Sequence, residues 1–296
     1  RDLHSFPTRR SSDLAYRGAK TEYRGLVLRG ETELDGVRGR CLELPDEPFG
    51  LLSQQASDLP GRLAGDPRLK CLFSAEHGFF GAAAPGEETA SSIHPRWGLP
   101  IHSLYGKTRK PTKEMLAGLK RIVVDLQDIG VRCYTYLATL KLVLEAAAEN
   151  FVAVTVFDRP VPVGGAAEGP MIERKWMSFV GPLNLPMRHG MTPGECARWI
   201  CREENLGIDL SVAKLEGWNH SVSAPWPSFM PPSPGIKSWD SAALYPATVF
   251  TEAFGAMDAD RSGTYAFRVV WHEGMDAWAL QDALQEEMGS CGFSLR

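Results

Sequence analysis

Four short runs of apolar residues constrain the fold of this chain more than any other feature of its sequence. The runs are Phe49–Ser53, Lys70–Ser74, Arg121–Leu126 and Val152–Phe157. Near-continuous apolar runs of this length are typical of strands that are buried on both faces of a parallel sheet. Turn or helix signals closely follow three of them. The sequence therefore predicts a parallel sheet at the centre of the fold.

Helix signals fill the sequence between these runs. Lys113–Leu119 follows a Pro-Thr pair, and Ala138–Glu149 is rich in strong helix formers. Thr192, Pro193 and Glu195 predict a helix start, with the threonine as cap, the proline in the first turn and the glutamate closing a capping box. Strands that alternate with helices predict a doubly wound α/β domain.

The composition changes after about residue 205. Residues 205–240 are dense in proline and tryptophan, which predicts an irregular loop that wraps a surface or cleft. A second unit is expected to begin near residue 239 and to be incomplete at the last residue, Arg296. We therefore predict one domain over residues 15–238 and a partial C-terminal domain over residues 239–296.

The first fourteen residues, RDLHSFPTRRSSDL, are expected to be foreign to the fold. They lack the apolar core of a signal peptide, and SFPTRRSSDL looks like a translated sequencing adaptor. We therefore leave residues 1–14 out of the fold prediction, and no export signal is visible in the sequence.

Charge and motif content exclude several classes of protein. The net charge of −4 argues against a nucleic-acid binder, and no apolar run approaches the roughly 18 residues that span a bilayer. Phosphate-binding glycine loops, the serine elbow of α/β-hydrolases and the His-Glu-x-x-His zinc motif are all absent from the sequence. We therefore expect neither a metal nor a cofactor. The six cysteines, which form no Cys-x-x-Cys pair, are interpreted as buried or incidental thiols.

Acidic side chains follow three of the predicted strands. Glu76, Asp128 and Asp158 each stand just after an apolar run, beside a glycine or proline turn. Ligands of an open parallel sheet bind beyond the carboxyl ends of its strands, so adjacent strands are expected to bring these acids into one crevice. The alternative interpretation is that the acids cap turns and helix N-termini.

The other polar residues near these strand ends favour a sugar ligand. His77, Arg132, Tyr134 and Arg159 are expected to line the same crevice with hydrogen-bonding groups. Glycoside cleavage usually needs two carboxyl groups, one that donates a proton and one that acts as base or nucleophile. The neighbouring phenylalanines at positions 79 and 80 are expected to raise the pKa of Glu76 towards that of a donor.

Several segments together resemble the NamZ-type exo-β-N-acetylmuramidase family. The matching stretches run in order from about residue 49 to residue 240, and they include FGLLSQQASD (49–58), LFSAEHGFFG (72–81), VVDLQDIGVRCYTYLATL (123–140), FDRPVPVGG (157–165), RHGMTPGE (188–195) and PPSPG (231–235). The resemblance implies a Rossmann-like domain, a smaller α+β domain and a cleft between them. It also implies a periplasmic or secreted glycoside hydrolase that removes N-acetylmuramic acid from the non-reducing end of peptidoglycan fragments.

The resemblance also implies roles for individual residues. Glu76 would be the catalytic acid, and the second carboxylate stays open between Glu87 and Asp128. Three residues are candidates for binding the lactyl carboxylate of the sugar, which guanidinium groups pair with well: Arg132, Arg159 and His189. Four others would hold hydroxyl and acetamido groups or brace the loops: Gln127, Tyr134, Asp158 and Glu168.

The sequence departs from the family pattern in several places. Ala75 stands where the family usually has proline, and Gln54 stands where it commonly has asparagine. The family's Glu-Gly-Thr-Asn stretch is replaced by Glu252–Gly255, and Arg261–Thr264 is a partial echo of the family pattern. Two alternatives follow: a non-catalytic protein that binds cell-wall sugars in the same cleft, and a hydrolase for another linkage, such as an amide. The sequence leaves the oligomeric state and the stereochemistry of cleavage open.

Overall fold

The computed structural model describes residues 33–34, 37–38, 47–54, 57, 59–215, 218–221, 229–261 and 263–289. The predicted foreign segment, residues 1–14, lies outside the described residues, as do Cys41 and Cys291. Of the six cysteines, Cys71 and Cys196 are buried free thiols, while Cys133 and Cys201 are partly exposed free thiols.

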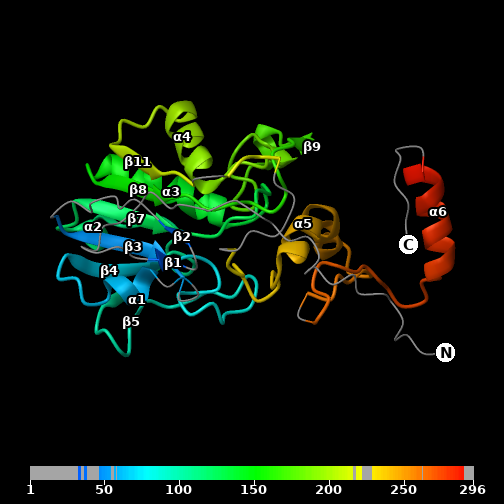
Figure 1. Ribbon diagram of the computed structural model, residues 1–296, viewed down its shortest axis with the longest axis horizontal. Coiled ribbons are helices and arrows are strands. Elements are labelled where there is room, and N and C mark those ends of the chain that lie inside the picture. The colour runs from blue at the N-terminus through cyan, green and yellow to red at the C-terminus, as the bar shows by residue number, and fades with distance from the viewer. Residues whose placement is uncertain are drawn as a thin grey trace.

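A seven-stranded sheet forms the centre of the molecule (Figure 1). Its strand order is β11-β8-β7-β3-β4-β6-β5, and every neighbouring pair is parallel except β5 with β6. The strands are β3 (Phe49–Ser53), β4 (Leu69–Ser74), β5 (Ser92–Ile93), β6 (Pro100–Ser103), β7 (Arg121–Asp125), β8 (Ala153–Phe157) and β11 (Leu210–Ala213). The predicted α/β fold with a mainly parallel sheet is therefore confirmed.

Helices cover both faces of this sheet. Neighbouring residues of the central strand β3 point to opposite faces and belong to different hydrophobic cores. Leu51 belongs to the core that contains Leu63 of α1. Leu52 belongs to the core that contains Leu140 of α3 and Ile200 of α4. In Figure 1, α3 and α4 are seen near β8 and β11, and α1 near β4. The helices are α1 (Leu59–Leu63), α2 (Lys113–Leu116), α3 (Tyr136–Glu149), α4 (Pro193–Glu203), α5 (Trp239–Thr248) and α6 (Ala277–Gly289).

The predicted helix starts agree with the structure in detail at α4. The side chain of Thr192 accepts a hydrogen bond from the backbone N–H of Glu195, and the Glu195 side chain accepts one from the backbone N–H of Thr192. Pro193 occupies the first turn, where its missing N–H costs nothing. Helix α2 ends earlier than predicted, because Gly118, just beyond it, has a left-handed φ of 78°.

Smaller elements extend the fold beyond one end of the sheet. Strands β9 (Glu168–Met171) and β10 (Pro186–Arg188) form an antiparallel pair with the 3-10 helix η2 (Arg174–Trp176) between them. Helix α5 continues into η3 (Val249–Ala253), and Figure 1 shows α6 standing apart from the sheet. The pair β1 (Glu33–Leu34) and β2 (Val37–Arg38) is antiparallel. The domain boundary near residue 238 stays a prediction.

None of the described helices has the length and apolar character that crossing a membrane requires.

Candidate active site

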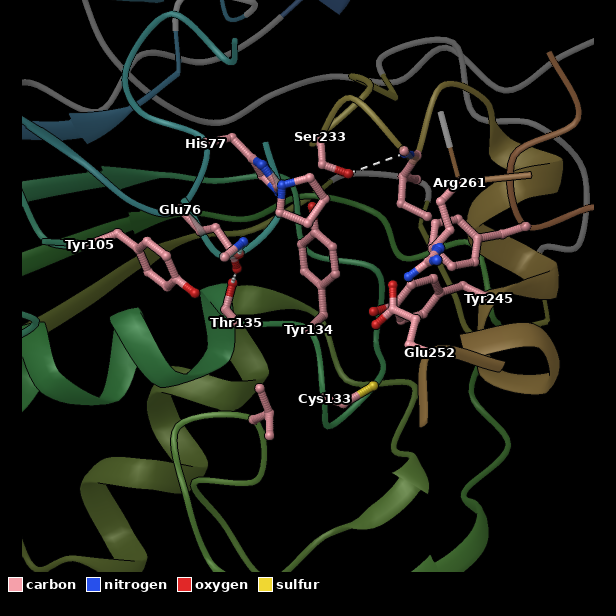
Figure 2. A pocket seen from close by; sticks show the side chains of 16 residues that line it. Glu76, His77, Tyr105, Cys133, Tyr134, Thr135, Ser233, Tyr245, Glu252 and Arg261 are labelled. Atoms are coloured by element: carbon pink, nitrogen blue, oxygen red, sulfur yellow. Dashed lines mark hydrogen bonds between the residues drawn. The ribbon is translucent and has the colours of Figure 1, made fainter. Parts of the chain in front are cut away.

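A pocket of about 420 Å³ opens beyond the carboxyl ends of β4 and β7. Three parts of the chain supply most of its lining: the turn after β4, the segment before α3, and residues 233–267 around α5 and η3. Figure 2 shows the lining side chains converging from these elements. The polar members of the lining are Glu76, His77, Tyr105, Cys133, Tyr134, Thr135, Ser233, Tyr245, Glu252 and Arg261.

Glu76 is held in the pocket by hydrogen bonds to both of its carboxylate oxygens. Oε1 accepts a hydrogen bond of 2.7 Å from the backbone N–H of Gly86, and Oε2 accepts one of 2.5 Å from Oγ1 of Thr135. The side chain is almost fully buried, with 8% of the residue exposed. In this geometry neither oxygen acts as the donor, and the carboxyl group has a fixed orientation.

The local backbone explains how Glu76 reaches this position. After β4 the chain turns sharply, with left-handed φ values of 70° at His77 and 72° at Gly78. Glu87 then closes the next turn, because its Oε2 accepts a hydrogen bond of 2.8 Å from the backbone N–H of Ala84. That turn presents the N–H of Gly86 to Glu76. Glu87 is itself exposed and does not line the pocket.

Three tyrosines line the pocket, Tyr105, Tyr134 and Tyr245, and the ring of Tyr136 packs edge-on against that of Tyr134. The hydroxyl of Tyr136 donates a hydrogen bond of 2.7 Å to the carbonyl of Pro232. The hydroxyl of Tyr134, a residue only 6% exposed, is buried beside Ser233 and has no hydrogen-bond partner among the described residues (Figure 2). Burial raises the pKa of Tyr134 well above its usual value, so the hydroxyl stays protonated. It is therefore a neutral hydroxyl that lies close to Ser233 and Tyr136 at the edge of the pocket.

Glu252 brings a second carboxyl group into the pocket from η3. Much of the residue is exposed, but its carboxyl group faces the pocket beside Arg261 (Figure 2). Burial of this group, and the negative charge of Glu76, raise the pKa of Glu252, while the positive charge of Arg261 opposes that rise. The pocket thus holds two carboxyl groups, from segments about 175 residues apart in the chain, that interact electrostatically.

Cys133 also lines the pocket but is a poor nucleophile. Burial is the main cause that raises the pKa of its thiol to about 11. At neutral pH the thiol is therefore protonated, and only a thiolate attacks effectively. Among the described residues, no group of three or more His, Cys, Asp and Glu side chains lies close enough together to hold a metal ion.

The structure places three of the eleven predicted site residues on the pocket: Glu76, His77 and Tyr134. The other eight lie elsewhere: Glu87, Gln127, Asp128, Arg132, Asp158, Arg159, Glu168 and His189. Most of these eight bind the backbone of the loops that follow the strands. They support the site from outside it.

Asp128 and Asp158, predicted to converge with Glu76, instead hold the backbone of their own surroundings. Asp128 Oδ1 accepts a hydrogen bond of 2.8 Å from the N–H of Gly130, and burial raises the pKa of Asp128 to about 7. Asp158 accepts hydrogen bonds from Oγ1 of Thr192 at 2.9 Å and from the N–H of Gly194 at 2.8 Å, and burial raises its pKa to about 6. Both acids therefore match the alternative interpretation, in which they cap turns and helix starts.

The three residues expected to bind a lactyl carboxylate are also engaged away from the pocket. Arg159 forms an ion pair with Asp125, with Nε 2.6 Å from Oδ1. Arg132 donates hydrogen bonds to two backbone carbonyls, those of Pro170 and Leu185. His189 is buried, and burial lowers its pKa to about 4, so it is neutral at ordinary pH.

Gln127 and Glu168 join loops. The amide of Gln127 donates hydrogen bonds of 2.8 Å to the carbonyl of Asp128 and 2.6 Å to that of Pro160. Glu168 forms an ion pair with Arg188 across the β9–β10 pair, with 2.5 Å between Oε2 and Nη1. These contacts fit the expected role of bracing loops.

Comparison with known proteins places this geometry in a family. The family model described as "Exo-beta-N-acetylmuramidase NamZ, N-terminal" matches residues 54–240. The chain belongs to this family. It is 38% identical over 252 residues to the peptidoglycan β-N-acetylmuramidase NamZ of Bacillus subtilis (strain 168), an alignment that covers 84% of this chain and 61% of that protein. The chain thus spans about three-fifths of the length of this relative.

Two crystal structures of DUF1343 family proteins from Bacteroides fragilis share the fold. One has 33% sequence identity and a TM-score of 0.73, with 82% of this chain and 65% of the other covered. The second has 29% identity and a TM-score of 0.68, with 79% and 64% covered. The likeness thus extends over about four-fifths of this chain.

The sequence reasoning missed several residues of the pocket, above all Tyr245, Glu252 and Arg261. All three lie beyond residue 240, where the match to the NamZ N-terminal family model ends. The only signals for them are the replacement of the family's Glu-Gly-Thr-Asn stretch by Glu252–Gly255 and the partial echo of the family pattern at Arg261–Thr264. Thr135 was also missed, although it lies inside a matched stretch, because a hydroxyl group carries no charge to mark it.

Proposed function

We propose that this chain hydrolyses the β-glycosidic bond of a terminal N-acetylmuramic acid residue in peptidoglycan fragments. The observation that carries the proposal is the pair of carboxyl groups, Glu76 and Glu252, in one pocket of about 420 Å³. Glycosidases use two such groups, one as proton donor and one as base or nucleophile. The relative from Bacillus subtilis, whose name states a peptidoglycan β-N-acetylmuramidase, supports this substrate.

The surroundings of the two carboxyl groups favour different roles for them. Glu252 has a pKa raised by burial and by the negative charge of Glu76, and a raised pKa favours the protonated form of a carboxyl group, which can donate. Glu76 accepts hydrogen bonds at both oxygens, which suits a carboxylate. We therefore assign the proton donor to Glu252 and the base or nucleophile to Glu76, the reverse of the role expected for Glu76 from the sequence.

The bond-breaking step follows from this assignment. Glu252 transfers its proton to the glycosidic oxygen as the bond from that oxygen to the anomeric carbon breaks. The Glu76 carboxylate faces the positive charge that develops at the anomeric carbon, and it either bonds to this carbon or removes a proton from an attacking water. Thr135 and the N–H of Gly86 keep Glu76 in place.

Two substrates with different leaving groups test the assignment. The substrates are the disaccharide N-acetylmuramyl-β-1,4-N-acetylglucosamine and 4-nitrophenyl β-N-acetylmuramide, whose nitrophenolate leaves without a proton. We expect Glu252→Gln to lower kcat for the disaccharide by roughly 10²- to 10⁴-fold, the usual contribution of a general acid, and to change the nitrophenyl reaction far less. Glu76→Gln is expected to lower kcat for both substrates.

Other results would contradict the proposal in identifiable ways. Equal losses for both substrates in Glu252→Gln would remove the donor role from Glu252. If the unaltered chain releases no N-acetylmuramic acid from the disaccharide, as followed by mass spectrometry, the hydrolase function fails. Glu168→Gln is a suitable control, because Glu168 pairs with Arg188 and does not line the pocket.

We further infer that the natural protein works outside the cytoplasmic membrane, in the periplasm or secreted, and takes part in cell-wall recycling. The support is the location of peptidoglycan itself, since an enzyme must meet its substrate. Fractionation of cells that express the natural gene would test this, and a purely cytoplasmic protein would contradict it.

A further inference from the structure

The substrate proposed above carries one group that distinguishes it from the other peptidoglycan sugar. N-acetylmuramic acid has a lactyl carboxylate on its ring, and N-acetylglucosamine has a hydroxyl at the same place. A pocket that selects the first sugar needs a positive charge to pair with this carboxylate. The three residues expected to supply it, Arg132, Arg159 and His189, are engaged elsewhere or neutral.

Arg261 is the one lysine or arginine among the described residues that line the pocket. Its Nε forms a long, exposed ion pair of 3.7 Å with Oδ1 of Asp258, and at this distance the guanidinium donates no hydrogen bond to Asp258. The side chain is 47% exposed, so a ligand can reach it. Figure 2 shows the guanidinium directed into the pocket beside Glu252.

The backbone that carries Arg261 is fixed by several hydrogen bonds. Asp258 and Trp271 exchange two backbone hydrogen bonds of 2.8 and 2.9 Å, and the N–H of Phe267 donates to the carbonyl of Ala259 at 2.8 Å. We call residues 258–271 the Arg261 hairpin. A guanidinium on a braced backbone loses less conformational freedom when it binds a carboxylate, and its planar group can donate two parallel hydrogen bonds.

We propose that Arg261 binds the lactyl carboxylate and so determines the preference of the pocket for N-acetylmuramic acid over N-acetylglucosamine. This inference rests on the proposed function for its substrate class. The carboxylate also neutralises Arg261 beside Glu252. A bound substrate therefore weakens the influence of Arg261 that lowers the pKa of Glu252, which favours the protonated, donating form of that residue.

Binding of the two free sugars tests this proposal without requiring turnover. Isothermal titration calorimetry would measure Kd for N-acetylmuramic acid and for N-acetylglucosamine with the unaltered chain, Arg261→Gln and Arg261→Lys. We expect Arg261→Gln to weaken the binding of N-acetylmuramic acid by roughly 10- to 100-fold, as for loss of a charge-assisted hydrogen bond, and to leave N-acetylglucosamine nearly unchanged. Arg261→Lys is expected to be intermediate, because an ammonium group does not bind in bidentate fashion.

Arg268→Gln is the matched control. It removes the same charge from the same hairpin, but Arg268 does not line the pocket, so the preference between the sugars should persist. Equal weakening of both sugars in Arg261→Gln, or no weakening of either, would overturn the proposal. Selective binding without hydrolysis of the disaccharide would uphold the role of Arg261 and reject the proposed function instead.

Discussion

The buried carboxyl group of Asp128 makes the stability of the folded chain depend on pH. Burial raises its pKa from 3.8 to about 7 in the folded chain, whereas in the unfolded chain the group titrates near its ordinary value. Between about pH 4 and pH 7 the folded state therefore binds more protons than the unfolded state. Its stability falls as the pH rises through this window, by on the order of 1 kcal/mol per pH unit from this group.

The substitution Asp128→Asn should remove this contribution while keeping an oxygen that accepts the hydrogen bond from Gly130. We expect this variant to gain stability relative to the unaltered chain between pH 4.5 and pH 7.5, as measured by urea unfolding at both values. His189 gives a control with the opposite pH dependence. Burial lowers its pKa from 6.5 to about 4, so its contribution to the free energy of unfolding rises as the pH rises between these values. An Asp128→Asn effect that is the same at both pH values would contradict the assignment.

At the scale of single residues, the sequence predicted residue type better than residue role. Glu76 is predictable as a site residue because it follows a strand and lies in a long stretch that matches the family. Glu87 and Asp128 have the same chemistry and similar positions, but each satisfies a nearby backbone N–H, that of Ala84 or Gly130. Glu76 also accepts a backbone N–H, so the difference is that Glu76 lines the pocket and the other two do not, which a linear sequence does not show.

At the scale of elements, the start of α4 is joined to the end of β8. Thr192 accepts a hydrogen bond from the N–H of Glu195 at 3.3 Å and donates one of 2.9 Å to Asp158, which also accepts the N–H of Gly194. The residues at the start of helix α4 thus donate hydrogen bonds to the buried carboxylate of Asp158 at the end of β8. This arrangement fixes one connection of the sheet.

Replacement of Thr192 by alanine should therefore cost more than loss of an ordinary cap. Loss of a cap costs roughly 0.5–2 kcal/mol, and an unsatisfied buried acceptor adds about 1–3 kcal/mol. We expect Thr192→Ala to lower the free energy of unfolding by about 2–4 kcal/mol in urea titrations, whereas Thr192→Ser, which keeps the hydroxyl, should lose much less. If alanine and serine destabilise the chain equally, the hydroxyl is not the cause.

Most of the strands and helices were predictable because burial on both faces leaves a strong pattern. The four predicted strands, the helices around α3 and α4, and the capping box are all present. Strand β6, Pro-Ile-His-Ser, was not predicted because it is short, polar and begins with proline. Strand β11, Leu210–Ala213, lies inside the stretch interpreted as an irregular loop, and its pairing with β8 depends on a partner that is far away in the sequence.

At the scale of the whole molecule, the pocket is where two distant parts of the chain meet. The turns after β4 and before α3 supply Glu76 and Thr135, and the region beyond residue 232 supplies Glu252 and Arg261. The first part follows from parallel strands, whose carboxyl ends share one edge. The second depends on how the chain after residue 240 folds back over that edge, and no periodic pattern in the sequence records such packing.

Gly235 lies in the second of these parts and packs directly against the Arg261 hairpin. A Cβ atom built there would lie 3.0 Å from Cε2 of Phe267 and 3.3 Å from the carbonyl oxygen of Arg261, so Gly235→Ala must push the Arg261 hairpin by a few tenths of an ångström. Since misplacement by about 1 Å can cost 10²-fold in rate, we expect roughly a tenfold loss of kcat/KM for the nitrophenyl substrate, with Tm little changed. Gly207→Ala is the matched control, because nothing lies within 4 Å of its added Cβ. Full activity in Gly235→Ala would mean that the hairpin does not have to keep its position for the pocket to work.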